Sequence, residues 1–116
     1  MVPTPHDPEP LYSRLAEDAD LGDIVELFVQ ELPDRVSNVL DRLDAADREG
    51  LRRLAHQLKG AAGSHGFDPI SQAAARVEDA IRASQPEAEI RRFVQVLVEL
   101  CRRARTGAPG GPAEMD

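Results

Sequence analysis

Residues 68–81 read DPISQAAARVEDAI and contain the clearest helix signal in the chain. Asp68 is a candidate N-cap residue, and Pro69 suits the first helical position, where an N–H group would lack a partner in any case. Apolar side chains then recur at spacings of three and four residues, which places them on one helix face. They are Ile70, Ala73, Ala74, Val77, Ala80 and Ile81. The stretch therefore predicts an amphipathic helix with one buried face.

Three further segments on either side repeat this spacing. They lie at residues 20–45 with Asp20 as the N-cap, at about 48–65, and from near 86 to the arginines at 102, 103 and 105. Pro33 lies inside the first of them, where its missing N–H group and its ring predict a kink or a break. The linkers are short, and short loops join helices that run antiparallel. The predicted fold is all-α, an up-and-down antiparallel four-helix bundle, with or without a short extra N-terminal helix around residues 11–15.

The composition agrees with this fold. A chain of 116 residues has room for one domain with one core. Its 41% of hydrophobic residues can fill that core, while 3% of aromatic residues and no Trp favour helix packing over a β-sandwich. Both ends are rich in proline or glycine and lack an apolar face. We therefore expect one bundle over residues 10–105, between disordered tails at 1–9 and 106–116.

The charge and the rare residue types exclude several functions. A net charge of −7 repels phosphate backbones and anionic lipids, so neither nucleic acid nor a membrane is an expected partner. The single Cys cannot form an internal disulfide, and the three His residues lack the spacing of a metal site, so no metal is expected. No apolar run reaches the roughly 18 residues of a membrane span, and the acidic, proline-rich start does not resemble a signal peptide. The expected state is a cytoplasmic monomer.

The stretch LRRLAHQLKGAAGSHG at residues 51–66 holds the candidate chemistry. At about 100° per residue, His56 lies on the side of the helix opposite to three leucines. They are Leu51, Leu54 and Leu58. If these leucines face the core, the imidazole of His56 faces solvent. The residues within about 60° of it are basic or lack a side chain. They are Arg52, Arg53, Lys59, Gly60 and Gly63.

The spacing leaves two interpretations of this face open. It is a solvated surface, with Gly60 ending the helix early, or it is a site that a partner protein approaches closely. A glycine inside a helix costs about 1 kcal/mol relative to Ala, and both glycines fall on the His56 side. An imidazole that exchanges a phosphoryl group with a partner needs this clearance and a cation near the phosphoryl oxygens. His56, Lys59 and Gly60 supply these features within five residues.

The run HQLKG at residues 56–60 resembles the HxxKG signature of histidine-containing phosphotransfer (HPt) domains. The similarity extends to the upstream ELP at residues 31–33, to Gly66, and to Glu78 about one helix further on, and it covers roughly residues 20–104. It implies a helical bundle whose exposed histidine is phosphorylated by one partner and passes the group to an aspartate of a receiver domain. It also implies a phosphoryl carrier without kinase activity. The chemotaxis-kinase phosphotransfer domain has a similar motif, so the branch stays open.

Carried onto this chain, the resemblance makes His56 the phosphorylated residue and Lys59 the cation that stabilises the phosphoryl group. Gly60 provides clearance, and Glu78 either hydrogen-bonds the imidazole or forms a surface salt bridge. The docking surface for the receiver comprises Arg52, Arg53, Gln57, Gly60 and Gly63. No cofactor is expected on the chain itself, because the receiver supplies magnesium and the acceptor aspartate. His65, which is no hallmark of the family, is assigned to packing at the helix end.

Two other classes of function match parts of the sequence. A non-catalytic helical docking module would bind a partner protein without transferring a group. The run AGSHG at residues 62–66 is one residue away from the GxSxG nucleophile elbow of hydrolases. That motif needs a preceding strand and a large sheet, and neither is predicted here. The docking module is therefore the alternative to phosphotransfer.

Overall fold

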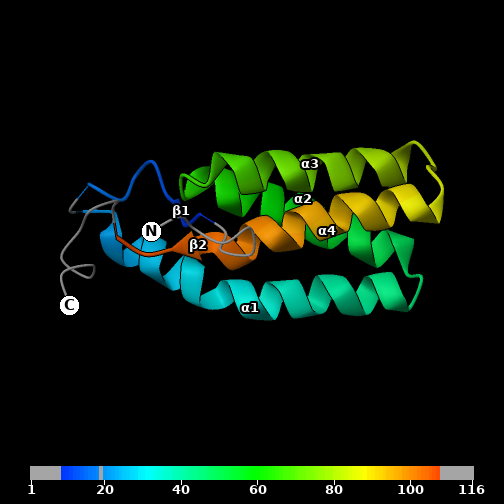
Figure 1. The fold of residues 1–116 in the computed structure, drawn as a ribbon, viewed down its shortest axis with the longest axis horizontal. Coiled ribbons are helices and arrows are strands. Elements are labelled where there is room, and N and C mark those ends of the chain that lie inside the picture. The colour runs from blue at the N-terminus through cyan, green and yellow to red at the C-terminus, as the bar shows by residue number, and fades with distance from the viewer. Residues whose placement is uncertain (1–8, 19, 108–116) are drawn as a thin grey trace, which may run out of the picture.

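The computed structural model describes residues 9–18 and 20–107, and its architecture is a bundle of four helices (Figure 1). The helices are α1 (Gly22–Asp44), α2 (Arg48–Ser64), α3 (Asp68–Arg82) and α4 (Glu87–Arg103). Each helix packs against the next along the chain, and α4 closes the bundle against α1. The predicted all-α four-helix bundle is confirmed. Residues 1–8 and 108–116, which make up most of the two predicted tails, lie outside the described part.

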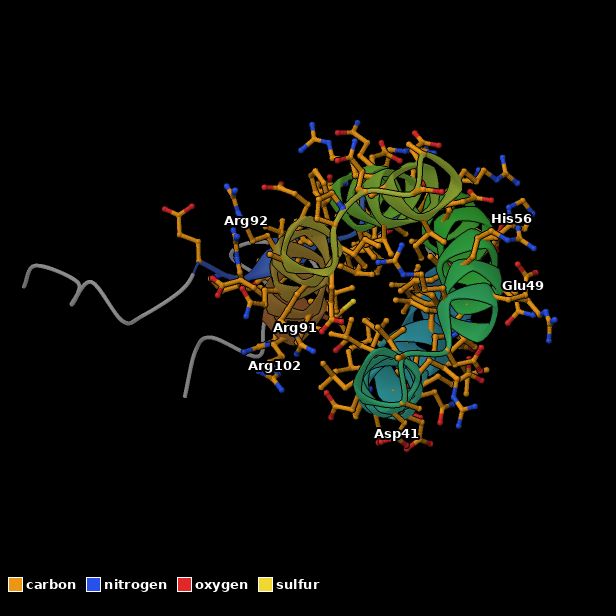
Figure 2. The ribbon with its side chains drawn as sticks, turned by 90° about the vertical axis from the view of Figure 1, so that its right-hand side faces the viewer. Asp41, Glu49, His56, Arg91, Arg92 and Arg102 are labelled. Carbon is orange, nitrogen blue, oxygen red and sulfur yellow. The ribbon has the colours of Figure 1, made fainter. Side chains whose placement is uncertain are left out.

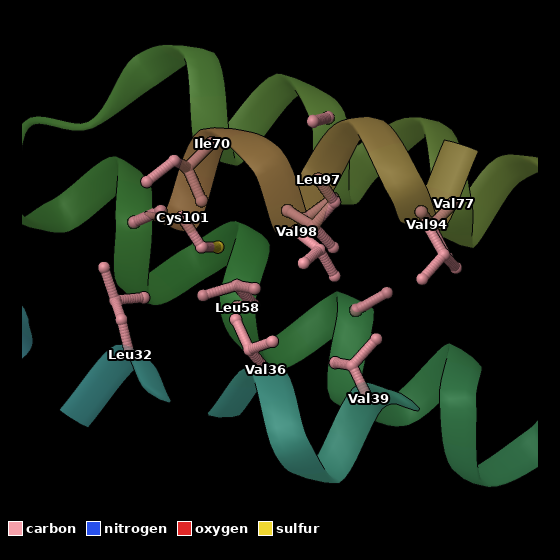
Figure 3. Close-up of a cluster of buried hydrophobic side chains, with 14 of the residues drawn as sticks. Leu32, Val36, Val39, Leu58, Ile70, Val77, Val94, Leu97, Val98 and Cys101 are labelled. Carbon is pink, nitrogen blue, oxygen red and sulfur yellow. The ribbon is translucent and has the colours of Figure 1, made fainter. Parts of the chain in front are cut away.

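The core lies along the bundle axis, between the four helices. In the end-on view the labelled charged side chains project outward (Figure 2), and a close-up shows aliphatic side chains from all four helices meeting inside (Figure 3). Burial of this apolar surface is the main stabilising contribution to such a fold. The largest fully buried apolar side chains are Phe67, Leu51, Leu58, Ile70, Ile90, Leu97, Val77 and Val94.

Leu54, which the spacing places on the core side of its helix, lies at the edge of the core, and Ile24 in the apolar series of α1 lies outside it. Ile24 is 47% exposed, because Val25 and Phe28 occupy the buried face of that part of α1. Leu54 is half-buried and packs only against the margin of the core. On α2 the small side chains of Ala55 and Ala62 are fully buried. The buried face of α2 therefore includes these two alanines, and Leu54 lies at its edge.

Two helix starts differ from the prediction by one residue. The N-cap position of α1 is Leu21 rather than Asp20. The backbone N–H of Asp20 donates to the Asp18 carboxylate at 2.9 Å, in the turn before the helix. The N-cap position of α3 is Phe67, so Asp68 is the first helical residue. Its carboxylate still favours the helix, because a negative charge in the first turn interacts well with the helix dipole.

Helix α1 continues through Pro33, so the predicted break does not occur. Pro33 lies on the exposed face of the helix. The carbonyl of Val29, four residues earlier, receives no N–H donor from the proline, and on this face it can bind water instead. The helix therefore buries one stripe along its whole length. This stripe comprises Val25, Phe28, Leu32, Val36, Val39 and Leu43.

The segment before α1 is extended, and the optional short helix around residues 11–15 is absent. Leu11–Tyr12 (β1) pairs in parallel with Ala104–Arg105 (β2), directly after α4. This two-residue pair is the only sheet in the described part of the chain. It joins the N-terminal segment to the end of the last helix, far away in the sequence.

The same N-terminal segment is also hydrogen-bonded to the loop between α2 and α3. The hydroxyl of Ser13 donates to the carbonyl of His65 at 2.5 Å, and the backbone N–H of Arg14 donates to the carbonyl of Gly66 at 2.9 Å. Gly66 has a φ of +81°, a conformation that favours glycine. A Cβ at this position would also clash with the Ser13 hydroxyl. The glycine therefore allows both the turn and the close approach.

Candidate functional site

His56 lies near the middle of α2, on the face that points away from the core (Figure 2). Its side chain is 58% exposed, whereas Leu51 and Leu58 are almost completely buried. This is the orientation that the helical spacing predicts. Helix α2 also runs without interruption past Gly60 to Ser64. The interpretation in which Gly60 ends the helix is therefore wrong.

Glu78 of α3 is a buried carboxylate beside this histidine. It is 1% exposed, and carboxylates are almost never fully buried unless they are paired. One carboxylate oxygen, Oε2, lies 2.9 Å from the Nδ1 of His56, and the other, Oε1, accepts a hydrogen bond from the Nζ of Lys59 at 2.9 Å. The extensive packing of α3 along α2 brings these residues together. Glu78 is thus a hydrogen-bond partner of the imidazole, and its burial sets it apart from a surface salt bridge.

Two arginines add further positive charge around Glu78. Arg82, one turn along α3, places a guanidinium nitrogen 2.9 Å from Oε2 of Glu78, and Arg52 of α2 places one 3.8 Å from the same oxygen. Arg52 also pairs with Glu49 at 2.5 Å. The sequence-based prediction did not include Arg82. The available signal was its i,i+4 spacing from Glu78, which puts both side chains on one helix face.

The contact with Glu78 selects the ring nitrogen that carries the proton. The hydrogen bond from Lys59 holds the pKa of the Glu78 carboxyl below its ordinary value, against the opposing effect of burial, and the hydrogen bond to His56 acts in the same direction. An ionised carboxylate only accepts hydrogen bonds, so this network assigns the proton to Nδ1 of His56. In the neutral ring, Nε2 is then the unprotonated nitrogen with a free electron pair.

Glu78 is expected to make the stability of the fold depend on pH in the acid range. Its folded-state pKa lies below the ordinary value of 4.5, so the ionised carboxylate stabilises the fold above pH 4.5. This contribution is lost as the pH falls through the lowered pKa. The difference in free energy of unfolding between the wild type and Glu78→Gln should therefore shrink as the pH falls from 7 towards about 3. Urea unfolding at each pH measures it, and a constant difference would contradict the prediction.

The two glycines on the His56 face have different surroundings. A Cβ built on Gly60 would meet nothing within 4 Å, so the space next to His56 is open there. A Cβ on Gly63 would lie 3.3 Å from the hydroxyl of Ser71 on α3. That hydroxyl donates to the carbonyl of Lys59 at 2.8 Å. The small size of Gly63 therefore serves the close packing of α3 on α2, while that of Gly60 leaves the surface open.

The exposed face of α2 extends from His56 towards α1. Arg53 and Gln57 are both exposed, and Gln57 lines a groove of about 370 Å³ between the two helices. Further along α1, the apolar side chains of Ile24 and Leu27 are 47% and 60% exposed. Exposed apolar residues next to a polar groove are common in surfaces that bind proteins.

His65 occupies the C-terminal end of α2 and packs there, as predicted. Its ring stacks on Phe28 with the ring centroids 4.8 Å apart, and its Nδ1 lies 2.6 Å from the carbonyl oxygen of Ala61. Both a face and an edge of this imidazole are therefore in contact with the protein. His65 is not part of the group of side chains around Glu78.

The described part of the chain has neither a cluster of metal-ligating side chains nor a membrane-spanning helix. No group of three or more His, Cys, Asp or Glu side chains within residues 9–18 and 20–107 is placed to hold a metal ion. None of the four helices has both the length and the apolar character needed to cross a lipid bilayer.

Comparison with known proteins identifies a family for the chain. The family model described as Hpt domain matches residues 23–107, which includes all four helices from the first turn of α1 onward. No curated protein and no solved structure matches the chain. The matched range contains every residue of the group around Glu78, from Arg52 and His56 of α2 to Arg82 of α3.

Proposed function

Because the chain belongs to the Hpt domain family, whose members transfer phosphoryl groups in two-component signalling, we propose that His56 is the residue that accepts the group. Hpt domains are phosphoryl carriers rather than kinases. The observation that supports His56 most strongly is its contact with buried Glu78, which leaves Nε2 unprotonated on a 58% exposed side chain. The proposed partner is the receiver domain of a response regulator or of a hybrid histidine kinase, in the cytoplasm.

In the proposed transfer, Nε2 of His56 attacks the phosphorus of an aspartyl phosphate on the receiver. The N–P bond forms, the bond between phosphorus and the aspartate oxygen breaks, and the carboxylate leaves with the bonding electrons. The Nδ1 proton stays in place, so the phosphorylated ring is positively charged. Glu78 stabilises this charge, because it accepts the Nδ1 hydrogen bond at 2.9 Å. Transfer to a receiver aspartate is the reverse of these steps.

Lys59 is the proposed cation for the phosphoryl oxygens. Its Nζ donates to Glu78 at 2.9 Å, and its side chain is 37% exposed. A phosphoryl group on Nε2 adds negative charge and three strong hydrogen-bond acceptors next to it. The ammonium group has three donors and can be shared between Glu78 and these oxygens. Arg82, whose side chain is 58% exposed, is a second candidate for the same interaction.

The receiver is proposed to dock over α2 and the α1–α2 groove. Gly60 leaves room for its approach to Nε2, and Gln57 and Arg53 offer polar contacts beside the histidine. Ile24 and Leu27 extend this surface with apolar contacts. The receiver would also supply the magnesium ion and the aspartate of the reaction.

The test is transfer of labelled phosphate from phosphorylated receiver domains to the purified chain, followed on a gel. We expect the chain to take up label that is acid-labile and base-stable, as phosphohistidine is. Adding unlabelled receiver should remove the label again, and Lys59→Ala should slow its uptake. No label from a receiver panel that phosphorylates another Hpt domain would contradict the proposal and favour the docking module.

A further inference from the structure

Besides its buried face, helix α4 has an exposed face that is partly apolar. This face lies on the opposite side of the bundle from His56. Figure 2 shows Arg92 and His56 on these opposite sides. Val96 lies at the centre of the face with a 51% exposed side chain, and the half-buried Phe93 and Leu100 flank it. A groove of about 530 Å³, lined by side chains of α4, runs along this face. An apolar strip of this kind, bordered by charges, is typical of a contact surface.

Four charged residues border the apolar strip, and their signs alternate along the helix. In chain order they are Glu89, Arg92, Glu99 and Arg103. Along the helix the four charges are negative, positive, negative and positive. In a helix that runs in the opposite direction, each of these positions meets a residue of the opposite sign. The face is therefore complementary in charge to an antiparallel copy of itself.

We propose that this face is the interface of an antiparallel homodimer, with α4 of one copy packed against α4 of a second copy. In a two-fold arrangement centred on Val96, residues equally far before and after it face each other. Val96 then meets Val96 of the second copy. Glu89, seven residues before it, meets Arg103, seven residues after it.

The remaining residues of the face pair within the same arrangement. Arg92 is four residues before Val96 and Glu99 three residues after it, so they meet with an offset of about 1.5 Å along the axis. Phe93 and Leu100 meet with the same small offset. Each of these pairs forms twice, because the two-fold axis repeats it.

The sides of the helix also match. At about 100° per residue, Arg92 and Glu99 lie on one side of Val96, while Phe93 and Leu100 lie on the other. A two-fold axis between antiparallel helices brings each side against the same side of the second copy. The ion pairs therefore form along one edge of the contact and the apolar pairs along the other. A parallel pair would instead place the charged side of one copy against the apolar side of the other, and it would bring Glu89 against Glu89 and Arg103 against Arg103.

Three of these four charged residues already make a contact within one copy. Arg92 pairs with Glu89 at 3.1 Å, and the Nε of Arg103 donates to the carbonyl of Glu9 at 2.7 Å. The other guanidinium nitrogens of Arg103 remain for a contact with Glu89 of the second copy. A contact between single helices is small, so the dimer is weak, with a Kd on the order of micromolar or above. Both His56 side chains stay exposed in this dimer. The proposed dimer is therefore a carrier with two phosphorylation sites, in place of the monomer expected from the sequence.

The test is analytical ultracentrifugation of the full chain over a concentration series up to about 1 mM. We expect a reversible monomer–dimer equilibrium. Arg92→Glu and Glu99→Arg should each raise the dimer Kd by about tenfold, because each creates two pairs of like charges. The double variant Arg92→Glu/Glu99→Arg should restore the wild-type Kd, since it reverses both charges of each pair and so restores the attraction between them. Val96→Glu should abolish the dimer.

The control is Leu27→Glu, which introduces the same charge at an exposed apolar residue of α1 and should leave the Kd unchanged. Circular dichroism verifies that each variant is folded. A chain that stays monomeric up to about 1 mM overturns the proposal, as does a dimer that Val96→Glu leaves intact. If the double variant has a higher dimer Kd than both single variants, the antiparallel register is wrong. Phosphotransfer by the Val96→Glu variant tests the proposed function separately, because His56 lies on the opposite side.

Discussion

Replacing His56 with glutamine is expected to abolish phosphoryl uptake while the bundle stays folded. Glutamine keeps a polar side chain but lacks the nucleophilic ring nitrogen, so label from a phosphorylated receiver should fall to background. The His56 side chain is 58% exposed, and Glu78 keeps its contacts with Lys59 and Arg82 in the variant. The free energy of unfolding should therefore change by no more than about 0.5 kcal/mol. Labelled transfer and urea unfolding measure the two effects.

The matched control is His65→Gln, the same change on the histidine that directly follows α2. The ring of His65 stacks on Phe28, and its Nδ1 contacts the Ala61 carbonyl, so its ring is held by packing at the helix end and has no contact with Glu78. This variant should lose stability through the missing stacking contact and still accept label in its folded form. Label that persists in His56→Gln, or that disappears only in His65→Gln, would refute the assignment of the site.

Gly60→Trp separates the chemistry at His56 from the docking of the receiver. The position is open in the structure, so the indole can be accommodated without disturbing the core. Its bulk should block the receiver and prevent transfer. Phosphoramidate, a small donor that needs no docked protein, should still phosphorylate His56 in this variant. Loss of both reactions would mean that Gly60 acts on the histidine itself.

The regular parts of this fold were predictable because their signals are local. Helices α2 and α3 begin within one residue of the predicted positions, and the leucines of α2 place His56 on its outer face. The pairing of β1 with β2 was not predictable. It joins Leu11–Tyr12 to Ala104–Arg105, and segments of two residues have no periodicity to detect.

The exact limits of the buried stripes also depend on packing that spacing alone does not define. The buried side of α2 is centred among Leu51, Leu58 and two alanines, roughly 70° away from Leu54. Alanine gives a weak hydrophobic signal in a sequence, so Ala55 did not shift the predicted centre. The same limit applies to the site. The burial of Glu78 results from the contact between α2 and α3, and only that contact brings Arg82 close to His56.

Truncating Leu58 to alanine is expected to lower the free energy of unfolding by about 2–5 kcal/mol. The Leu58 side chain is 2% exposed, and Figure 3 shows it within the cluster of apolar side chains between the helices. Removing its branched end leaves a cavity that the surrounding helices fill only in part. Urea unfolding should show a lower midpoint with an unchanged m-value, because the same fold unfolds.

Leu54→Ala removes the same atoms from a half-buried side chain at the edge of the α1–α2 groove. Solvent can occupy the space that it leaves, so the loss of stability should be clearly smaller than for Leu58→Ala. Because the chemical change is identical, the difference between the two variants reports their burial alone. Burial around α2 defines the rotation of the helix about its axis, and the same rotation holds His56 outside and against Glu78. A larger loss for Leu54→Ala would therefore refute the helix orientation on which the proposed site depends.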